Sequence, residues 1–386
     1  MSGSAQSSEP LISIVIPTRE RVAKLPFTLR TVLSQGGDDF EVVISDNASQ
    51  DGTRSVVEGL SDSRLRYVNT GRRLSISDSF EFAIQHSRGR YLLVIGDDDG
   101  LVPDAIATLR VLVGRELAPI IYWDPPVYSW PTPVSGARLV YYPGRSSTRV
   151  VSLGEMTRFS FRWGGLRYQR LPLLYHALVR RDLLEKIRER TGRILHSTLP
   201  DVFLAFALPV FSDTALFTGK PLSVYGVSEP PLHSKPMEND EGAFVRKIHR
   251  LVEEYGGYRL HPTLYPGVPF WVNMIPDTML VARDLFPEYY STRPLDHDAM
   301  WAFLWRYWRF DSVFGIAAKA RQIRAYHPFH VGRYFFFVAA NAVSEVRMAA
   351  RRLLRSDPAT RPIERWPDDI AEFVIRVHAL EQQRVA

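Results

Sequence analysis

The chain has 386 residues, of which 45% are hydrophobic and 23% charged, and its formal net charge is +6. These values are ordinary for a globular protein with one large or two modest domains. The sequence has no cysteine, which excludes disulfides and thiolate chemistry. It also has no apolar run of about 18 residues, so we expect no membrane-spanning helix. The mild basic excess favours anionic partners.

The first ten residues, MSGSAQSSEP, are polar. They lack the apolar core of a secretory signal, so residues 1–10 are predicted to be a disordered leader. We therefore expect a cytoplasmic location, either free or at the inner face of the cell membrane.

Short apolar runs alternate with amphipathic segments from residue 11 to about 113. Strands are predicted at residues 11–16, 40–45, 65–68 and 91–95. Helices are predicted at residues 25–35, 53–60, 77–87 and 103–113. This alternation predicts an α/β fold, with a mostly parallel sheet and helices on both faces. Ligands bind such sheets beyond the carboxyl ends of the strands.

The rest of the chain is less regular. Strands and loops are predicted at 120–142, an extended stretch turning helical at 173–190, a helix at 202–208 and a strand at 220–225. Beyond about residue 240 the pattern is mainly helical and rich in aromatic residues. We therefore divide the chain into a first half at 11–115, a second half at 116–235 and a mainly helical region at 236–386.

The segment LLVIGDDDGLVP, from Leu92 to Pro103, places three acids directly after a predicted strand. One acid would suffice to cap the following helix. Adjacent carboxylates repel one another by roughly 1 kcal/mol per pair even in water at about 4 Å. A divalent cation would relieve that repulsion, and hard oxygen ligands suit Mg²⁺ or Mn²⁺ shared with substrate phosphates.

The segment SDNASQDGT, residues 45–53, follows the second predicted strand. Its composition is that of an ordinary turn. Its position, however, directs Asp46 and Asn47 toward the expected ligand, where such side chains pair with a base edge or a ribose hydroxyl.

Three segments in order, SIVIPTRERVAKLPFTLRTVLSQ, FEVVISDNASQDGT and GRYLLVIGDDDGLVPDAI, resemble the nucleotide-binding half of a family 2 glycosyltransferase with the GT-A fold. The resemblance implies a nucleotide-sugar-binding half at 11–115 and an acceptor-binding half at 116–235. It also implies a Mn²⁺ or Mg²⁺ cofactor and a nucleotide-diphospho-sugar donor.

The resemblance also implies roles for single residues. The donor-binding positions are Pro17, Thr18, Arg19, Glu20, Asp46, Asn47, Arg73, Asp97 and Asp98. The metal-binding positions are Asp98, Asp99 and a loop histidine, His233. Gly96 and Glu20 depart from the family, since many relatives have Asp and Asn there. The division of roles among the three acids is therefore open. Arg72, Arg180 and Arg181 are further candidates to meet the diphosphate, with solvated surface arginine as the default.

Inverting transfer needs a base that takes the proton of the acceptor hydroxyl. Leu199-Pro-Asp201 resembles the element that carries this base, with Pro200 in place of Glu, which implies Asp201 as the catalytic base. A plain helix N-cap is the alternative.

Other functions were weighed. A nucleotidyltransferase would show a Gly- and Lys-rich loop between Pro17 and Arg30, and a dehydrogenase would show Gly-x-Gly-x-x-Gly there; both are absent. A non-catalytic nucleotide-sugar or glycan-binding subunit stays open, as does a peripheral membrane protein whose tail is the active part. Residues 333–355 read either as a membrane-surface segment or as a core helix with a basic outer face. The aromatic block 301–310 is expected in the core rather than in a sugar platform.

The expectation is an inverting, metal-dependent glycosyltransferase, with a UDP-sugar favoured as donor. The acceptor would be a glycan, a lipid-linked saccharide or a glycosylated metabolite, which suits polysaccharide biosynthesis by single additions. No nucleic acid partner is expected, and a homodimer is left open.

Overall fold

The computed structural model describes residues 9–115, 118–131, 137–141, 147–165, 167–228, 260–264, 270–307, 330–340 and 367–385, with the short pieces 253–254, 256, 324 and 343. No helix within these ranges combines the length and the apolar character that crossing a bilayer requires.

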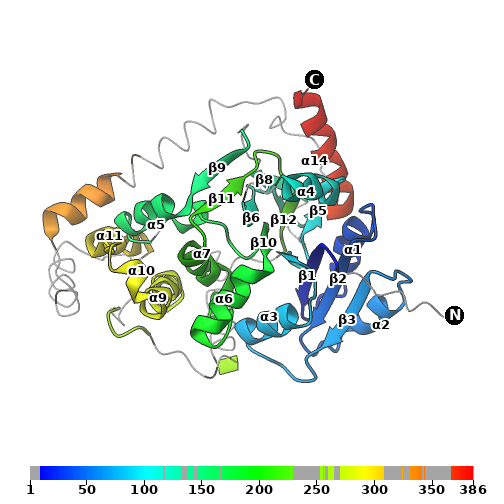
Figure 1. The fold of residues 1–386 in the computed structure, drawn as a ribbon, viewed down its shortest axis with the longest axis horizontal. Helices are drawn as coiled ribbons and strands as arrows, with labels where there is room; N and C mark the ends of the chain where they lie inside the picture. The colour runs from blue at the N-terminus through cyan, green and yellow to red at the C-terminus, as the bar shows by residue number, and fades with distance from the viewer. Residues whose placement is uncertain are drawn as a thin grey trace.

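The N-terminal part contains the expected alternation of strands and helices (Figure 1). Its strands are β1 (Ile12–Thr18), β2 (Phe40–Asp46), β3 (Leu65–Asn69) and β4 (Tyr91–Val94). Its helices are α1 (Leu25–Leu33), α2 (Thr53–Glu58), α3 (Ile76–Gln85) and α4 (Ala105–Gly114). Each element ends within two residues of its predicted limits.

The main sheet has the order β3-β2-β1-β4-β10-β6-β11-β9. The added strands are β6 (Ile120–Tyr122), β9 (Arg149–Ser152), β10 (Ala177–Arg180) and β11 (Thr214–Phe217). β1 to β4 pair in parallel, and so do β6 and β11, whereas β10 and β9 run antiparallel to their neighbours. The predicted α/β class with a mostly parallel sheet is confirmed.

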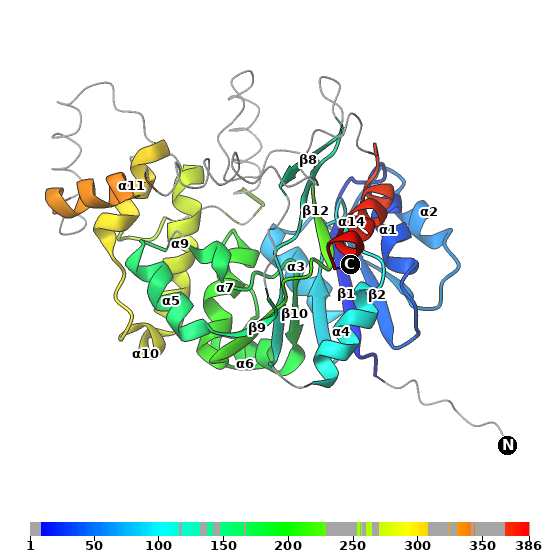
Figure 2. The same cartoon turned by 90° about the horizontal axis from the view of Figure 1, so that it is seen from above.

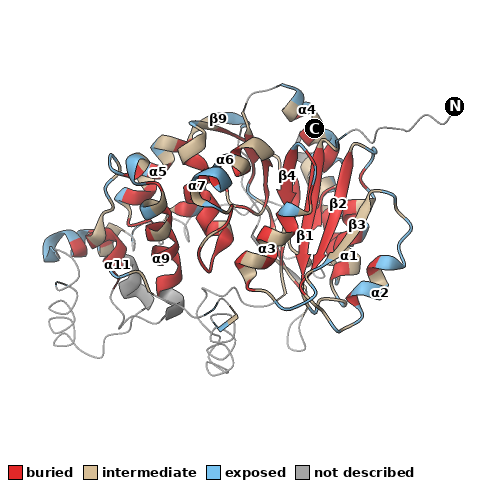
Figure 3. Cartoon of the chain, turned by 60° about the horizontal axis from the view of Figure 1, so that its bottom comes forward, coloured by how far each residue is buried: buried red, intermediate tan, exposed pale blue. Residues whose placement is uncertain are grey.

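Both faces of this sheet are covered. The strand residues are apolar at successive positions, and alternate side chains enter two different cores. Ile14 and Ile16 pack with α1, α4 and the C-terminal helix α14 (Ile370–Val385), whereas Val15 packs toward α3 and the helices of the second half. Figure 3 shows the resulting sheet as an almost continuous buried layer.

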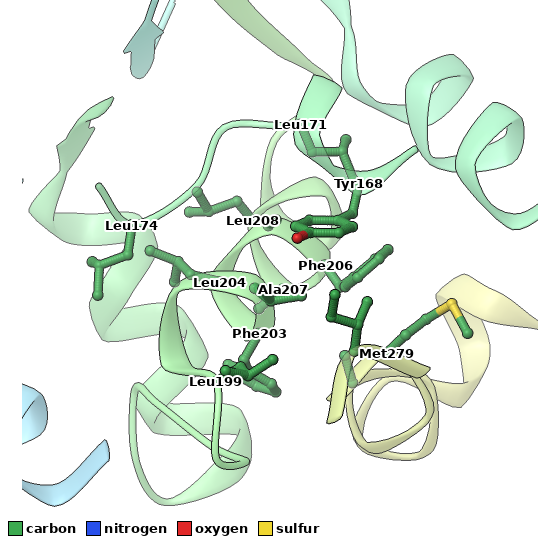
Figure 4. Packing of buried hydrophobic residues seen from close by; sticks show 14 of the residues in the cluster. Tyr168, Leu171, Leu174, Leu199, Phe203, Leu204, Phe206, Ala207, Leu208 and Met279 are labelled. Atoms are coloured by element: carbon green, nitrogen blue, oxygen red, sulfur yellow. The ribbon is translucent and has the colours of Figure 1, made fainter. Parts of the chain in front are cut away.

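The second half is organised around helix α7 (Pro200–Phe211). Nine of its residues are buried, from Pro200 to Pro209, so this helix is apolar on nearly all sides. Around it lie α5 (Leu153–Arg162), α6 (Arg181–Thr191) and α9 (Phe270–Leu285). Figure 4 shows Phe206 of α7 between Tyr168 and Met279, and Phe203 beside Leu199. Two further helices, α10 (Pro287–Tyr290) and α11 (His297–Tyr307), follow α9.

The expectation that the aromatic block at 301–310 belongs to the core is met where the structure describes it. Trp301 is 2% exposed and Ala302 is 4% exposed. Residues 308–310 lie outside the described residues.

A second, four-stranded sheet has the order β5-β12-β7-β8, with β5 (Gly100–Leu101), β7 (Val127–Ser129), β8 (Arg138–Tyr141) and β12 (Ser223–Val227). β5 follows the acidic run directly, and β12 pairs with it. This pairing brings residues 223–228 against residues 97–99. The C-terminal helix α14 lies beside α1 and β5 in both ribbon views (Figures 1 and 2).

Candidate active site

The three acids lie in the turn that leaves β4. β4 pairs in parallel with β1, so the carboxyl ends of these two strands meet at one edge of the sheet. Thr18, the last residue of β1, donates a hydrogen bond from Oγ1 to Oδ2 of Asp97 at 2.7 Å. Arg21 Nε lies 3.8 Å from Asp97 Oδ1. The predicted donor-binding residues Thr18 and Asp97 are therefore in contact, and the Arg21 guanidinium lies beside them.

Asp98 is held from the second sheet. The Ser228 hydroxyl, which follows β12, donates to its carboxylate, and Trp130 Nε1 donates to its backbone oxygen at 2.9 Å. Lys24 Nζ sits 4.1 Å from the centre of the Trp130 ring. Burial lowers the pKa of Lys24, and the nearby Asp98 charge opposes that shift.

Asp99 points inward. Its side chain is 1% exposed and accepts the backbone N–H of Gly96 at 2.6 Å and of Gly226 at 2.8 Å. Thr28 Oγ1 donates to the Asp99 carbonyl at 2.7 Å. The Asp99 carboxylate thus joins the acidic turn to β12, and a metal-binding role for it would compete with these two bonds.

Burial raises the pKa of all three carboxyls. The pKa of Asp97 rises to about 7, first because of burial and then because of the Asp98 charge. The pKa of Asp98 is raised by burial, against the hydrogen bond from Ser228, and that of Asp99 is raised further by burial and by Asp98. Three adjacent carboxylates with so little solvent are unfavourable without added positive charge.

This electrostatic imbalance fits a divalent cation. Among the residues that the structure describes, no group of three or more His, Asp or Glu side chains surrounds one metal position. Mg²⁺ and Mn²⁺ do not need such a cage, because one or two carboxylates, waters and substrate phosphates complete their coordination. Asp97 and Asp98 are the carboxylates suited to this role.

His176 is buried beside Asp99. Its Nε2 is 3.7 Å from Asp99 Oδ2 and its Nδ1 is 2.7 Å from Ser223 Oγ. Burial lowers the pKa of His176 to about 3, so the imidazole is neutral at physiological pH. It therefore packs against the site without adding a positive charge.

Asp201 shares two electrostatic partners with the acidic turn. It lies in the first turn of α7, where the helix dipole favours a carboxylate. Two tyrosines link it to the acidic turn: Tyr225 interacts electrostatically with Asp99, Asp98 and Asp201, and Tyr175 with Asp201, Asp99 and Asp97. Burial is the main cause that raises the pKa of both phenols. Both phenols therefore stay protonated at physiological pH.

The predicted base-binding residues are engaged by the protein itself. Asp46 is fully buried and accepts from Tyr67 Oη at 2.6 Å and from Ser49 N at 2.9 Å. Asn47 fixes the loop after β3, since its amide accepts from Leu74 N at 2.8 Å and donates to Leu74 O at 3.0 Å. Their contact with a nucleotide stays a prediction.

The other predicted donor-binding residues lie around the end of β1. Pro17 is buried within the strand. Arg19 Nη1 pairs with Glu254 Oε2 at 2.8 Å, and Glu20 pairs with Arg73 at 3.3 Å on the surface. His233 lies outside the described residues.

Two of the further arginine candidates lie elsewhere. Arg180 is in register with Tyr91, at the amino end of β4, and pairs with Asp182. Arg181 donates to Gly89 O at 2.6 Å. Both therefore belong to the edge of the sheet opposite the acidic turn, which argues against a role at the diphosphate.

Sequence reasoning missed five residues that complete the site: Arg21, Lys24, Tyr175, Tyr225 and Ser228. Arg21 and Lys24 follow the end of the first predicted strand by a few residues, which is a usable signal. Tyr175, Tyr225 and Ser228 reach the site because strands far apart in the sequence pair with one another. No local sequence pattern indicates these three residues.

Most comparisons with known proteins concern the N-terminal part of the chain. The model of the family "Glycosyl transferase family 2" matches residues 13–143. Residues 13–143 therefore resemble a family 2 glycosyltransferase domain. The matched segment holds β1 to β4 and the acidic turn, and Asp201 lies beyond it.

Relatives of the glycosyltransferase domain match over short stretches. The "GalNAc(5)-diNAcBac-PP-undecaprenol beta-1,3-glucosyltransferase" of Campylobacter jejuni is 29% identical over 103 residues, which are 26% of this chain and 33% of that protein. The "Validoxylamine A glucosyltransferase" of Streptomyces hygroscopicus is 49% identical over 67 residues, 17% of this chain and 16% of that protein. The matches thus span a third or less of these relatives' lengths.

Among solved structures, S. aureus TarS 1–349 in complex with UDP-GlcNAc superposes with a TM-score of 0.47 at 15% identity. The match covers 76% of this chain and 79% of that chain.

Proposed function

We propose that the protein transfers a sugar from a nucleotide diphosphate donor, with a UDP-sugar favoured, to a hydroxyl of a glycan, a lipid-linked saccharide or a glycosylated metabolite. The observation that carries the proposal is the acidic turn Asp97–Asp99 at the carboxyl end of β4, where Asp99 is buried and Asp97 and Asp98 are half-buried. Tyr175 and Tyr225 interact electrostatically with this turn and with Asp201. On this proposal, a cation-binding group and a separate carboxylate would lie on two sides of one reaction centre.

On this proposal Asp97 and Asp98 hold Mn²⁺ or Mg²⁺, which would supply Lewis acidity toward the leaving diphosphate. Thr18 and Ser228 orient the two carboxylates through their hydroxyls. Arg21 and Lys24 add positive charge beside them. Asp99 keeps the turn attached to β12 through Gly226 and takes no direct part.

Asp201 is proposed as the general base. The acceptor oxygen attacks the anomeric carbon and forms a new C–O bond, while the bond from that carbon to the diphosphate breaks. The nucleoside diphosphate leaves with the electron pair, and the hydroxyl proton passes to the Asp201 carboxylate. Attack opposite the leaving group inverts the anomeric centre.

The sequence of residues 333–355, with its apolar and basic residues, supports contact with a membrane surface, where a lipid-linked acceptor would be found. The catalytic proposal can be tested without knowing the acceptor, because hydrolysis of the donor by water would use the same residues.

The test uses donor hydrolysis and thermal unfolding with UDP-glucose, UDP-GlcNAc and GDP-mannose, each with and without Mn²⁺. Asp98→Asn is expected to abolish both Mn²⁺-dependent stabilisation and turnover. Asp201→Asn is expected to retain the stabilisation and lower turnover by about 100-fold or more, the usual contribution of a general base.

The matched control is Asp104→Asn. Asp104 follows the acidic turn, is 74% exposed and has a left-handed backbone that asparagine tolerates. It should behave as the parent. Mn²⁺-dependent donor binding without turnover in the parent protein would favour the non-catalytic binding subunit instead.

A further inference from the structure

A cavity lies far from the acidic turn. Its volume is about 660 Å³ and its walls come from α5, from the segment between α10 and α11, and from residues 330–337, which include His330 and part of the helix at 331–340. Figures 1 and 2 place these elements at one end of the molecule, opposite α14 and β1. The proposed transfer chemistry does not use this cavity.

The cavity wall is basic. It contains four arginines and two histidines against two aspartates, and these basic residues are Arg158, Arg162, Arg293, Arg333, His297 and His330. Arg158 and Arg293 converge on the same side chain, since both interact electrostatically with Tyr289. Such convergence of guanidinium groups favours an anion with several oxygens, above all a phosphate.

The two aspartates of the wall neutralise only part of this charge. Asp296 pairs with Arg333, and Asp298 accepts from both His330 N and His330 Nδ1 at 2.9 Å. Arg158 and Arg162 are exposed and make no ion pair within the described part of the chain. Their charge is therefore available to a ligand.

An apolar surface adjoins the cavity. The helix at 331–340 has the sequence VGRYFFFVAA, with Arg333 as its single charged residue. Phe337 is buried and lines the cavity, whereas Val331, Phe335 and Phe336 are 45%, 51% and 64% exposed. Large aromatic side chains directed at solvent beside a basic cavity are uncommon unless they contact an apolar partner.

We propose that this cavity binds the phosphate headgroup of an anionic lipid, and that Val331, Phe335 and Phe336 enter the apolar layer beside it. Charge complementarity assigns the headgroup to Arg158, Arg162 and Arg293. Exposed phenylalanines next to arginine are the combination that anchors a short helix at a membrane interface. This inference deepens the membrane contact of the proposed function.

The test is sedimentation of the full chain with vesicles, without donor or acceptor, so that its failure leaves the proposed transfer untouched. The vesicles contain phosphatidylcholine alone or phosphatidylcholine with phosphatidylglycerol. The parent protein is expected to bind the anionic vesicles, and to bind them less as the salt concentration rises.

Two variants probe the two parts of the site. Arg158→Gln with Arg162→Gln should weaken binding about 30-fold, since each basic residue near an anionic surface contributes about 1 kcal/mol. Phe335→Ser with Phe336→Ser should also lose binding. All four side chains are exposed, so the unfolding temperature and donor hydrolysis should match the parent.

The matched control is Arg188→Gln with Arg190→Gln, which removes the same charge from the exposed surface of α6. It should bind vesicles as the parent does. Equal binding to neutral and anionic vesicles, or an equal loss in this control, would overturn the headgroup site. If inorganic phosphate stabilises the parent protein but the protein does not bind vesicles, the cavity would bind a soluble phosphate compound. That result would overturn the lipid assignment.

Discussion

At the residue scale, Gly226 sets how closely the second sheet approaches the acidic turn. A Cβ atom there would lie 1.7 Å from the Asp98 carbonyl oxygen, which is backbone and cannot rotate away. Gly226→Ala is therefore expected to destabilise the fold by about 3 kcal/mol, the upper range for overpacking. Urea unfolding measures this.

The control for Gly226 is Gly114→Ala. Gly114 ends α4, and a Cβ atom there would meet nothing within 4 Å. Alanine should leave stability unchanged or raise it by up to about 1 kcal/mol. Equal stability of the two variants would contradict the close approach of β12 to the acidic turn.

His196 is expected to make the free energy of unfolding depend on pH. It is half-buried beside Thr191 Oγ1 at 3.0 Å, and burial lowers its pKa from 6.5 to about 4. In the unfolded chain the His196 imidazole is therefore protonated below about pH 6.5, whereas in the folded chain it is protonated only below about pH 4. Stability should fall as the pH drops through this window, by at most about 1.4 kcal/mol per pH unit from this group.

The measurement is the difference in unfolding free energy between the parent and His196→Gln at several pH values. The variant lacks the titrating group, so it should gain on the parent as the pH falls from 6.5 toward 4. A difference that does not change with pH would show that burial of His196 does not perturb its titration.

The acids show what a sequence can predict at this scale. The run at 97–99 predicts a cation site at the end of β4, because three adjacent carboxylates after a strand repel one another without added positive charge. It could not indicate which acid points inward. That is decided by the bond from Gly226 N to Asp99, across 127 positions of sequence.

At the scale of elements, α14 ties the end of the chain to the N-terminal half. Phe373 is fully buried, and its ring centre lies 4.6 Å from that of Tyr128. Phe373→Ala should destabilise the protein by about 3 to 5 kcal/mol, the usual cost of removing a buried phenylalanine. Ile375 on the same helix is 61% exposed, so Ile375→Ala should change stability by no more than about 0.5 kcal/mol.

Thermal and urea unfolding compare these two variants. A large loss for Phe373→Ala alone would support α14 as a structural part of the first domain. Equal small effects would contradict its packing against α1 and β5.

The sequence predicted the elements of the first 115 residues because apolar periodicity there is regular. It missed α5, β9 and β11. α5 carries a local signal, since Ser152 caps it by accepting from Glu155 N at 3.3 Å, the spacing of a capping box. β9 and β11 are four residues each and are defined by pairing with each other, which no short pattern reveals.

At the scale of the whole molecule, the alternation of strands and helices was enough to predict the sheet, its layers and the edge that carries the site. The return of α14 to α1 and the pairing of β12 with β5 were not predictable, because both depend on contacts between distant parts of the chain. The division of the chain at 115 and 235 stays a prediction. The structural unit formed by residues 11–115 also includes α14, because this helix packs against α1 and β5.

The central claim is that Asp97 and Asp98 hold a divalent cation that binds the diphosphate of the donor. The most direct measurement is a crystal structure with UDP and Mn²⁺, using the anomalous signal of manganese. We expect a manganese peak at Asp97 and Asp98, beside the diphosphate of the bound UDP. A nucleotide bound elsewhere, or bound at β4 without manganese at these aspartates, would contradict it.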